Sequence, residues 1–103
     1  MLVLVIEAGE QPKRKEIDGS LESLQKEVGG YIEAVYPYND PIALVCDEEG
    51  KIKRKEPNRP LCDSSGFMYD FIAGTFLVVG LGEDDFTSLT DELAKKYEQM
   101  FSM

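Results

Sequence analysis

Three uninterrupted apolar runs constrain the fold of this chain most strongly. They are "LVLVI" (residues 2–6), "IALVC" (residues 42–46) and "TFLVV" (residues 75–79). Successive side chains of a strand point to opposite faces, so a continuous apolar run rich in β-branched residues is typical of a strand covered on both faces. We therefore expect three strands here, the first two buried on both faces.

Shorter segments predict the remaining strands. The segment "KRKEI" (residues 13–17) can return antiparallel to the first run as an edge strand, where lysines discourage aggregation. Residues 31–36 alternate between two faces and predict another strand. The segment "DEEG" (residues 47–50) predicts a hairpin loop in which Gly50 takes a positive φ, followed by a returning strand over residues 51–55.

Two segments carry helix signals. In "DGSLESLQKEVGG", Ser20 is a candidate N-cap, apolar residues recur at helical spacing, and Gly29 with Gly30 predicts the end. The second helix follows either Ser88 or Thr90 as N-cap. The predicted order is β-β-α-β-β-β-loop-β-α. We expect one α+β domain over residues 1–103, with two layers: a mostly antiparallel sheet of five to six strands and two helices packed on it.

Residue content restricts the chemistry. The chain has no histidine, which removes the usual general base, the usual Ser–His and Cys–His dyads and most metal sites. Two cysteines are too few for a disulfide framework, and Cys46 is expected to be a core residue. We therefore favour a protein that is not an enzyme, and we expect neither a cofactor nor a metal. The opening apolar run lacks a preceding basic residue and is too short for a secretory signal or a membrane span, so a cytoplasmic protein with free thiols is expected.

Charge argues against nucleic acid and membranes as partners. The net charge is −9, and most basic residues fall in residues 13–15 and 51–59. An acidic protein is repelled at long range by both kinds of anionic partner. The stripe from Lys51 to Arg59 is the best nucleic-acid candidate, but no aromatic residues interleave with it, so a solvated edge hairpin is favoured. In "GLGEDDF", three acidic residues occupy the place that a dinucleotide phosphate would take, which argues against such a site.

The segment from Asn58 to Asp70 is the candidate functional site, predicted as an irregular loop. Pro57 and Pro60 restrict the backbone around Arg59. A guanidinium held in this way can grip a carboxylate or a phosphate. Other polar side chains of the segment could complete a pocket around that group; the candidate binding residues are Asn58, Arg59, Tyr69 and Asp70, with Ser64 and Ser65 beside them.

A structural role for the same segment is the favoured interpretation. Arg59 would tie the loop to Asp70 or to a sheet carbonyl, while Phe67 and Tyr69 would cover the second face of the sheet. The two prolines would lower the entropy of the unfolded chain. "PNRP" is therefore predicted to be a clamp first and a binding element second.

Five words, in this order, resemble a known family: "GGYIEAVYP", "ALVCDEEGK", "PNRPL", "DFIAGTFLVVG" and "FTSLTDE". They are similar to the bacterial family called domain of unknown function 3846, and the resemblance covers nearly the whole chain. It implies a short cytosolic protein that works beside genes of conjugative elements and phages of Gram-positive bacteria. It implies no activity, cofactor or catalytic residue, so no role is carried to any position here.

Three functions remain open from the sequence. The first is a non-enzymatic accessory protein that binds another protein through the segment 58–70. The second is an acidic mimic of nucleic acid, of the anti-restriction type. The third is a small-molecule or nucleotide site in which Arg59 holds an anionic group and Tyr69 or Asp70 handles a proton. The oligomeric state is left open.

Overall fold

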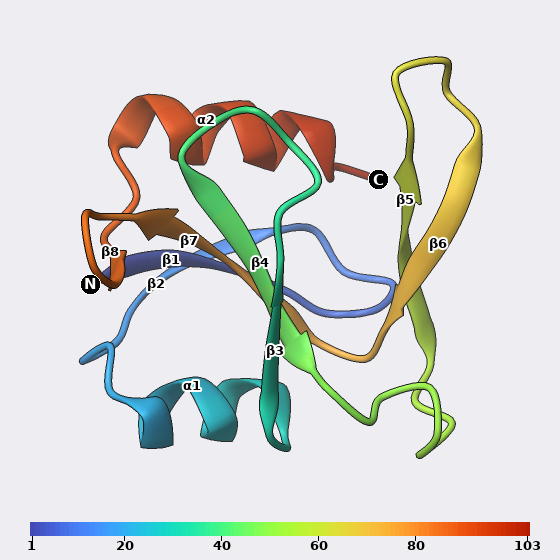
Figure 1. The fold of residues 1–103 in the computed structure, drawn as a ribbon, viewed down its shortest axis with the longest axis horizontal. Helices are drawn as coiled ribbons and strands as arrows, with labels where there is room; N and C mark the ends of the chain where they lie inside the picture. The colour runs from blue at the N-terminus through green and yellow to red at the C-terminus, as the bar shows by residue number, and fades with distance from the viewer.

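The fold is an antiparallel sheet with a helix on each face and a separate two-stranded hairpin (Figure 1). The computed structural model describes residues 1–103. Its elements are β1 (Leu2–Ile6), β2 (Lys13–Glu16), α1 (Leu21–Val28), β3 (Ile32–Val35), β4 (Ile42–Asp47), β5 (Pro57–Cys62), β6 (Met68–Ala73), β7 (Phe76–Leu81), β8 (Phe86–Thr87) and α2 (Asp91–Met100). The main sheet has the order β2-β1-β7-β4-β3, with β8 paired to β7, and every pairing is antiparallel. The predicted α+β class is confirmed.

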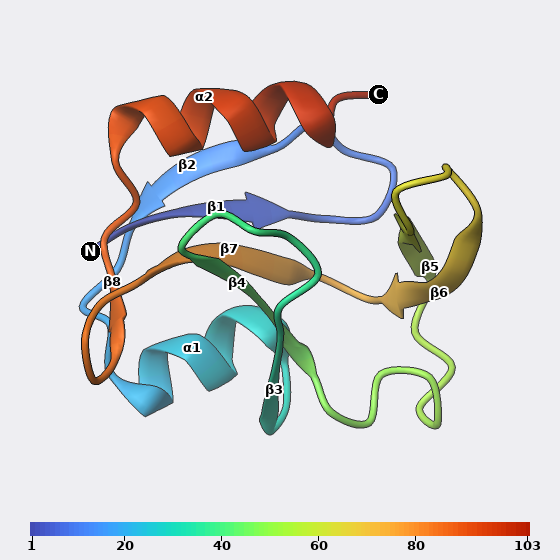
Figure 2. The same cartoon turned by 45° about the horizontal axis from the view of Figure 1, so that its top comes forward.

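The three apolar runs form the centre of this sheet. Strands β1, β7 and β4 lie side by side, and nearly all their residues are buried. Their side chains form two separate cores, one under α1 and one under α2 and the β5–β6 hairpin. Figure 2 shows the two helices on opposite faces of the sheet. The predicted two layers are therefore wrong, because strands that are apolar on both faces need cover on both faces.

The helix ends follow local capping chemistry. The Ser20 hydroxyl accepts a hydrogen bond from the Ser23 amide, and Gly29 ends α1 with a left-handed φ of 77°, as predicted. Of the two candidates for α2, Thr90 is the N-cap, since its side chain accepts from the Leu93 amide. Neither helix is long and apolar enough to cross a membrane.

Residues 51–54 form a turn and residue 55 lies in no strand, so the predicted returning strand over residues 51–55 is wrong. The buried carboxylate of Asp47 binds the ammonium groups of Lys53 at 2.9 Å and Lys55 at 2.6 Å, which folds the segment back on itself. Lys55 also donates to the carbonyl of Val28 at 2.8 Å and so caps the end of α1. Gly50 does not have the predicted positive φ. It is needed for its size, because a Cβ there would lie 2.6 Å from the Ala73 carbonyl oxygen.

The predicted loop 58–70 is a hairpin. Strands β5 and β6 pair antiparallel in a sheet of their own, with register shifts near the prolines and near Cys62. Pro57 and Pro60 are tolerated because β5 has a free edge, where a missing donor costs little. The hairpin packs on the α2 face of the main sheet through Leu61 and Ile72.

Candidate functional site

The base of the hairpin is fixed to the main body by Asn58. Its amide nitrogen donates to the carbonyls of Ile6 and Gly74, both at 2.9 Å. Its amide oxygen accepts from Nη1 of Arg59 at 2.7 Å. Asn58 therefore joins the end of β1, the end of β6 and the neighbouring arginine.

Arg59 is buried, and its guanidinium is fully used by hydrogen bonds inside the protein. Nε and Nη2 both donate to the Phe101 carbonyl, at 3.0 and 2.8 Å. Nη2 also donates to the Glu10 carbonyl at 2.6 Å, and Nη1 reaches the Glu7 carbonyl at 3.5 Å as well as Asn58. These contacts use all five N–H groups of the side chain. No donor is left for a carboxylate or phosphate ligand.

The charge of Arg59 faces the end of α2 rather than an acid. Phe101 is the C-cap of that helix, and the last turn of the helix has no basic residue of its own. The C-terminal end of a helix carries partial negative charge, so Arg59 supplies the missing cation from β5. Burial lowers the pKa of Arg59. The predicted clamp thus binds main-chain carbonyls of Glu7, Glu10 and Phe101, and Asp70 takes no part.

Asp70 does not contact Arg59 and pairs instead with Lys51. The hydrogen bond from Lys51, followed by one from the Phe71 amide, lowers the pKa of this carboxyl. The same Lys51 ammonium lies 4.8 Å from the centroid of the Phe71 ring. Lys51 therefore fixes the turn of residues 51–54 to the middle of β6.

The outer face of the hairpin is apolar and exposed. Four of the ten large exposed hydrophobic side chains come from the five residues 67–71: Phe67 (75% exposed), Met68 (63%), Tyr69 (59%) and Phe71 (37%). We call these four residues the hairpin patch. Pro60 lies across from Phe71 and extends it. The expectation that Phe67 and Tyr69 cover the sheet is wrong, because β6 turns Ile72 inward in their place.

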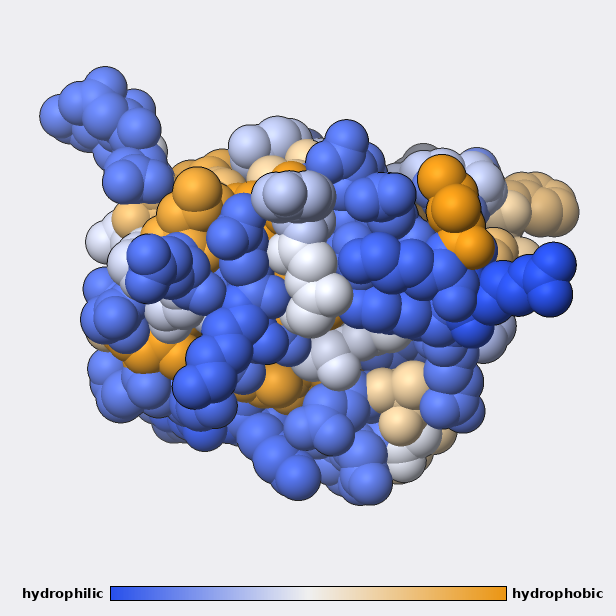
Figure 3. Space-filling view, turned by 90° about the horizontal axis from the view of Figure 1, so that it is seen from below, coloured by the Kyte–Doolittle hydropathy of each residue, from blue (hydrophilic) through white to orange (hydrophobic).

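The face of the molecule on which α1 lies is mostly hydrophilic. Seen from the side on which α1 lies, hydrophilic residues cover most of the molecule, and apolar residues show only in small separate areas (Figure 3). Only seven of the 20 acidic side chains are in ion pairs, so the surface is rich in unpaired carboxylates.

Hollows flank the hairpin, but none joins the four candidate binding residues. A hollow of about 300 Å³ between β3, β4 and β6 is lined by Asp70 and not by Arg59. Another, of about 440 Å³ beside the end of α2, is lined by Arg59 and not by Tyr69 or Asp70. Asn58 and Arg59 anchor the hairpin from inside, Tyr69 points outward, and Asp70 faces the first hollow.

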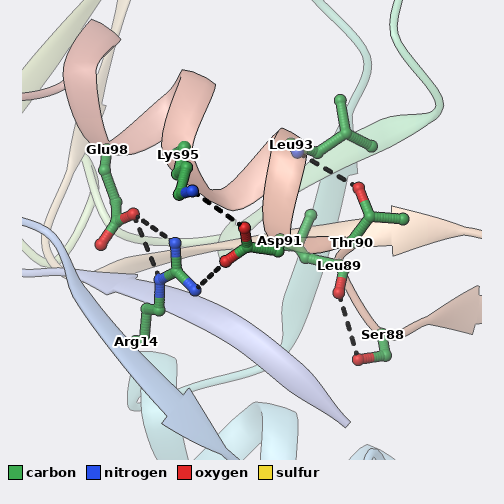
Figure 4. A network of polar contacts seen from close by, with 8 residues as sticks. All are labelled: Arg14, Ser88, Leu89, Thr90, Asp91, Leu93, Lys95 and Glu98. Carbon is green, nitrogen blue, oxygen red and sulfur yellow. Dashed lines mark hydrogen bonds and ion pairs between the residues drawn. The ribbon is translucent and has the colours of Figure 1, made fainter.

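Most side chains of the two basic segments serve internal contacts. In the first, Arg14 lies between Asp91 and Glu98 of α2, at 2.7 and 2.9 Å, and fastens β2 to that helix (Figure 4). Both carboxylates raise the pKa of Arg14, Glu98 through the larger effect. In the second, Lys51, Lys53 and Lys55 bind carboxylates, and Arg59 is buried. A free basic stripe for nucleic acid is not present.

Three residues of the hairpin patch, Phe67, Met68 and Phe71, were not predicted as site residues. The sequence holds a signal for Phe71: once residues 68–73 are taken as a strand, it falls on the same face as Tyr69. Residues 68–73 were not predicted as a strand, because the prolines that became part of β5 favoured an irregular loop for the whole segment.

Comparison with known proteins agrees with the resemblance noted in the sequence. Residues 1–102 match the family described as domain of unknown function (DUF3846). No curated protein and no solved structure matches the chain. With the match covering nearly every residue, the chain belongs to this family of domains of unknown function.

Proposed function

We propose that this chain is a small non-enzymatic accessory protein that binds another protein through the hairpin patch. The observation that carries the proposal is the gathering of Phe67, Met68, Tyr69 and Phe71 within five residues, on a surface rich in unpaired carboxylates. Contiguous exposed apolar patches on soluble proteins mark interaction sites. The proposed location is the cytoplasm, which the free thiols support. The proposed genetic context is a mobile element, which the family resemblance of the sequence supports.

The way the hairpin is held supports a binding role. Asn58 and Arg59 join its base to β1, to the turn after β1 and to the end of α2. Its aromatic side chains are therefore presented on a backbone that is already ordered. An interface formed from ordered groups loses less conformational entropy on binding, and aromatic residues are common hot spots.

The partner is expected to present an apolar recess bordered by basic groups. The chain carries a net charge of −9, and most of its carboxylates face no cation, whereas its lysines and arginines are largely used internally. Complementary charge raises association rates and disfavours acidic partners.

The contacts of the reactive groups favour binding over catalysis. Arg59 has no free donor for an anionic substrate, and Asp70 is paired with Lys51. Cys46 is buried, and burial raises the pKa of its thiol to about 11, so little thiolate forms near neutral pH. These contacts disfavour the small-molecule alternative at the Arg59 segment.

The test is site-specific photo-cross-linking. A benzophenone side chain replaces Tyr69 on the hairpin or Leu21 on α1, which is 57% exposed and serves as the matched control position. The protein is irradiated in an extract of the host cell, and the products are identified by mass spectrometry. We expect one protein to be linked from position 69 and not from position 21, and to form a complex with the purified chain.

Two results would count against the proposal. Equal cross-linking from both positions would show non-specific contact. A complex that forms with purified partner but weakens steeply with salt and ignores the Tyr69→Ala substitution would instead favour acidic mimicry of nucleic acid.

A further inference from the structure

Strand β3 is an edge of the main sheet with unpaired backbone groups. It pairs only with β4, in the register Glu33 to Cys46 and Val35 to Leu44. The Tyr31 carbonyl accepts from the Glu48 amide, so odd-numbered residues of this segment face β4. The N–H and C=O groups of Ile32 and Ala34 therefore point away from the sheet. Such an edge is a template for an added strand.

The two edges of the sheet differ in protection. At the opposite edge, β2 is the fully exposed segment "KRKE", and Arg14 and Lys15 fasten it to α2 and α1. Strand β3 has no lysine, arginine or proline between Ile32 and Val35. The basic side chains that protect exposed edges in natural sheets are thus present on β2 and absent from β3, whose one charged side chain is Glu33.

An amphipathic hollow lies beside the β3 edge. The hollow of about 300 Å³ is lined by Glu33 and Val35 of β3, by Glu48, and by apolar residues of the hairpin such as Ile72. Its other carboxylates already have cations, since Asp47 binds Lys53 and Lys55 and Asp70 binds Lys51. Glu33 and Glu48 have no ion-pair partner.

We propose that an extended basic segment of the partner protein adds to β3 as a further strand and places a lysine or arginine side chain in this hollow. The inference rests on the proposed function, because it names the part of the partner that binds beside the hairpin patch. Alternate side chains of the added strand fall on the face to which Glu33 and Val35 point. There the aliphatic stem would contact apolar residues, and the charged end would reach the unpaired carboxylates.

A second copy of this chain fits the edge less well. Pairing of β3 with β3 would bring two Glu33 side chains and two acidic molecules together. In a pairing of β3 with β2 of another copy, Arg14 and Lys15 could bind Glu33 only by leaving their present carboxylates. Charge complementarity therefore points to a basic segment of a different protein.

The probe is a blocked peptide of alternating valine and lysine, titrated into the full chain labelled with ¹⁵N. A twin with glutamate in place of lysine is the control ligand. We expect amide shifts centred on residues 31–36, stronger binding of the basic peptide, and at least about tenfold weaker binding to Ala34→Pro. The Ala34 amide makes no ladder bond, so the fold should survive this substitution.

A second variant, Glu33→Gln, keeps the test decisive if Ala34→Pro fails to fold. This variant should weaken binding of the basic peptide and leave binding of the glutamate peptide unchanged. Shifts spread over the acidic surface, equal binding of the two peptides, or binding that ignores Glu33→Gln would overturn the inference. The cross-link from position 69 does not depend on β3. A positive cross-link with a negative titration would therefore reject strand addition and retain the hairpin interface.

Discussion

Replacing Arg59 by alanine tests whether the candidate site residue is an anchor. The side chain is 7% exposed, and its two bonds to the Phe101 carbonyl are buried. A buried carbonyl that loses its donor costs about 1–3 kcal/mol, and the lost aliphatic stem adds roughly 1.5 kcal/mol. Removing a desolvated charge offsets part of this sum, so we expect a loss of about 3 kcal/mol in the free energy of unfolding.

The assay is urea unfolding followed by circular dichroism, with thermal melting as a second measurement. The midpoint should fall at unchanged slope, and Tm should drop by roughly 10–20 °C. Arg54→Ala is the matched control, because Arg54 is exposed. Arginine and alanine both carry a Cβ, so the backbone strain of the positive φ of 59° at this position is the same in the native chain and in the variant. Arg59→Lys keeps the charge but offers three donors, so it should fall between alanine and the native residue. A change below about 0.5 kcal/mol for Arg59→Ala would refute the anchor.

Three further substitutions test other parts of the fold. Burial raises the pKa of Asp47, but the hydrogen bonds from Lys55 and Lys53 lower it by more, to about 2. This depressed folded-state pKa should stabilise the protein by roughly 2 kcal/mol above pH ~5; the stabilisation is lost as pH falls toward ~2, and urea titrations of Asp47→Asn should lack this loss. Gly50→Ala should lower Tm, because its Cβ would meet the Ala73 carbonyl oxygen at 2.6 Å; a normal Tm would contradict the close approach. Thr90→Ala should destabilise α2 by about 1 kcal/mol and speed hydrogen exchange of the Leu93 amide, and unchanged exchange would argue against this N-cap.

The central strands and the helix ends could be predicted because their signals are local. The runs that became β1, β4 and β7 are apolar at nearly every position, which is a property of the sequence itself. Ser20 and Gly29 act on amides and carbonyls within a few residues. The charged segment 51–55 was mispredicted because its lysines look solvated in sequence, whereas two of them bind buried Asp47.

The sequence singled out the segment 58–70, but its geometry could not be predicted. The acceptors of Arg59 belong to Glu7, Glu10 and Phe101, which are remote in sequence and contribute only main-chain atoms. No residue pattern can reveal such a contact. The exposure of Tyr69 likewise depends on how β6 packs on the sheet, and this packing becomes visible only when the fold is known.

The most direct test of protein binding through the hairpin patch is a calorimetric titration of the cross-linked partner, once purified, against three forms of the chain. These are the native chain, the double variant Phe67→Ala/Tyr69→Ala, and Leu21→Ala as an exposed apolar control. We predict at least about tenfold weaker binding for the double variant, at unchanged Tm, and native affinity for the control. Native affinity of the double variant would contradict the proposed interface.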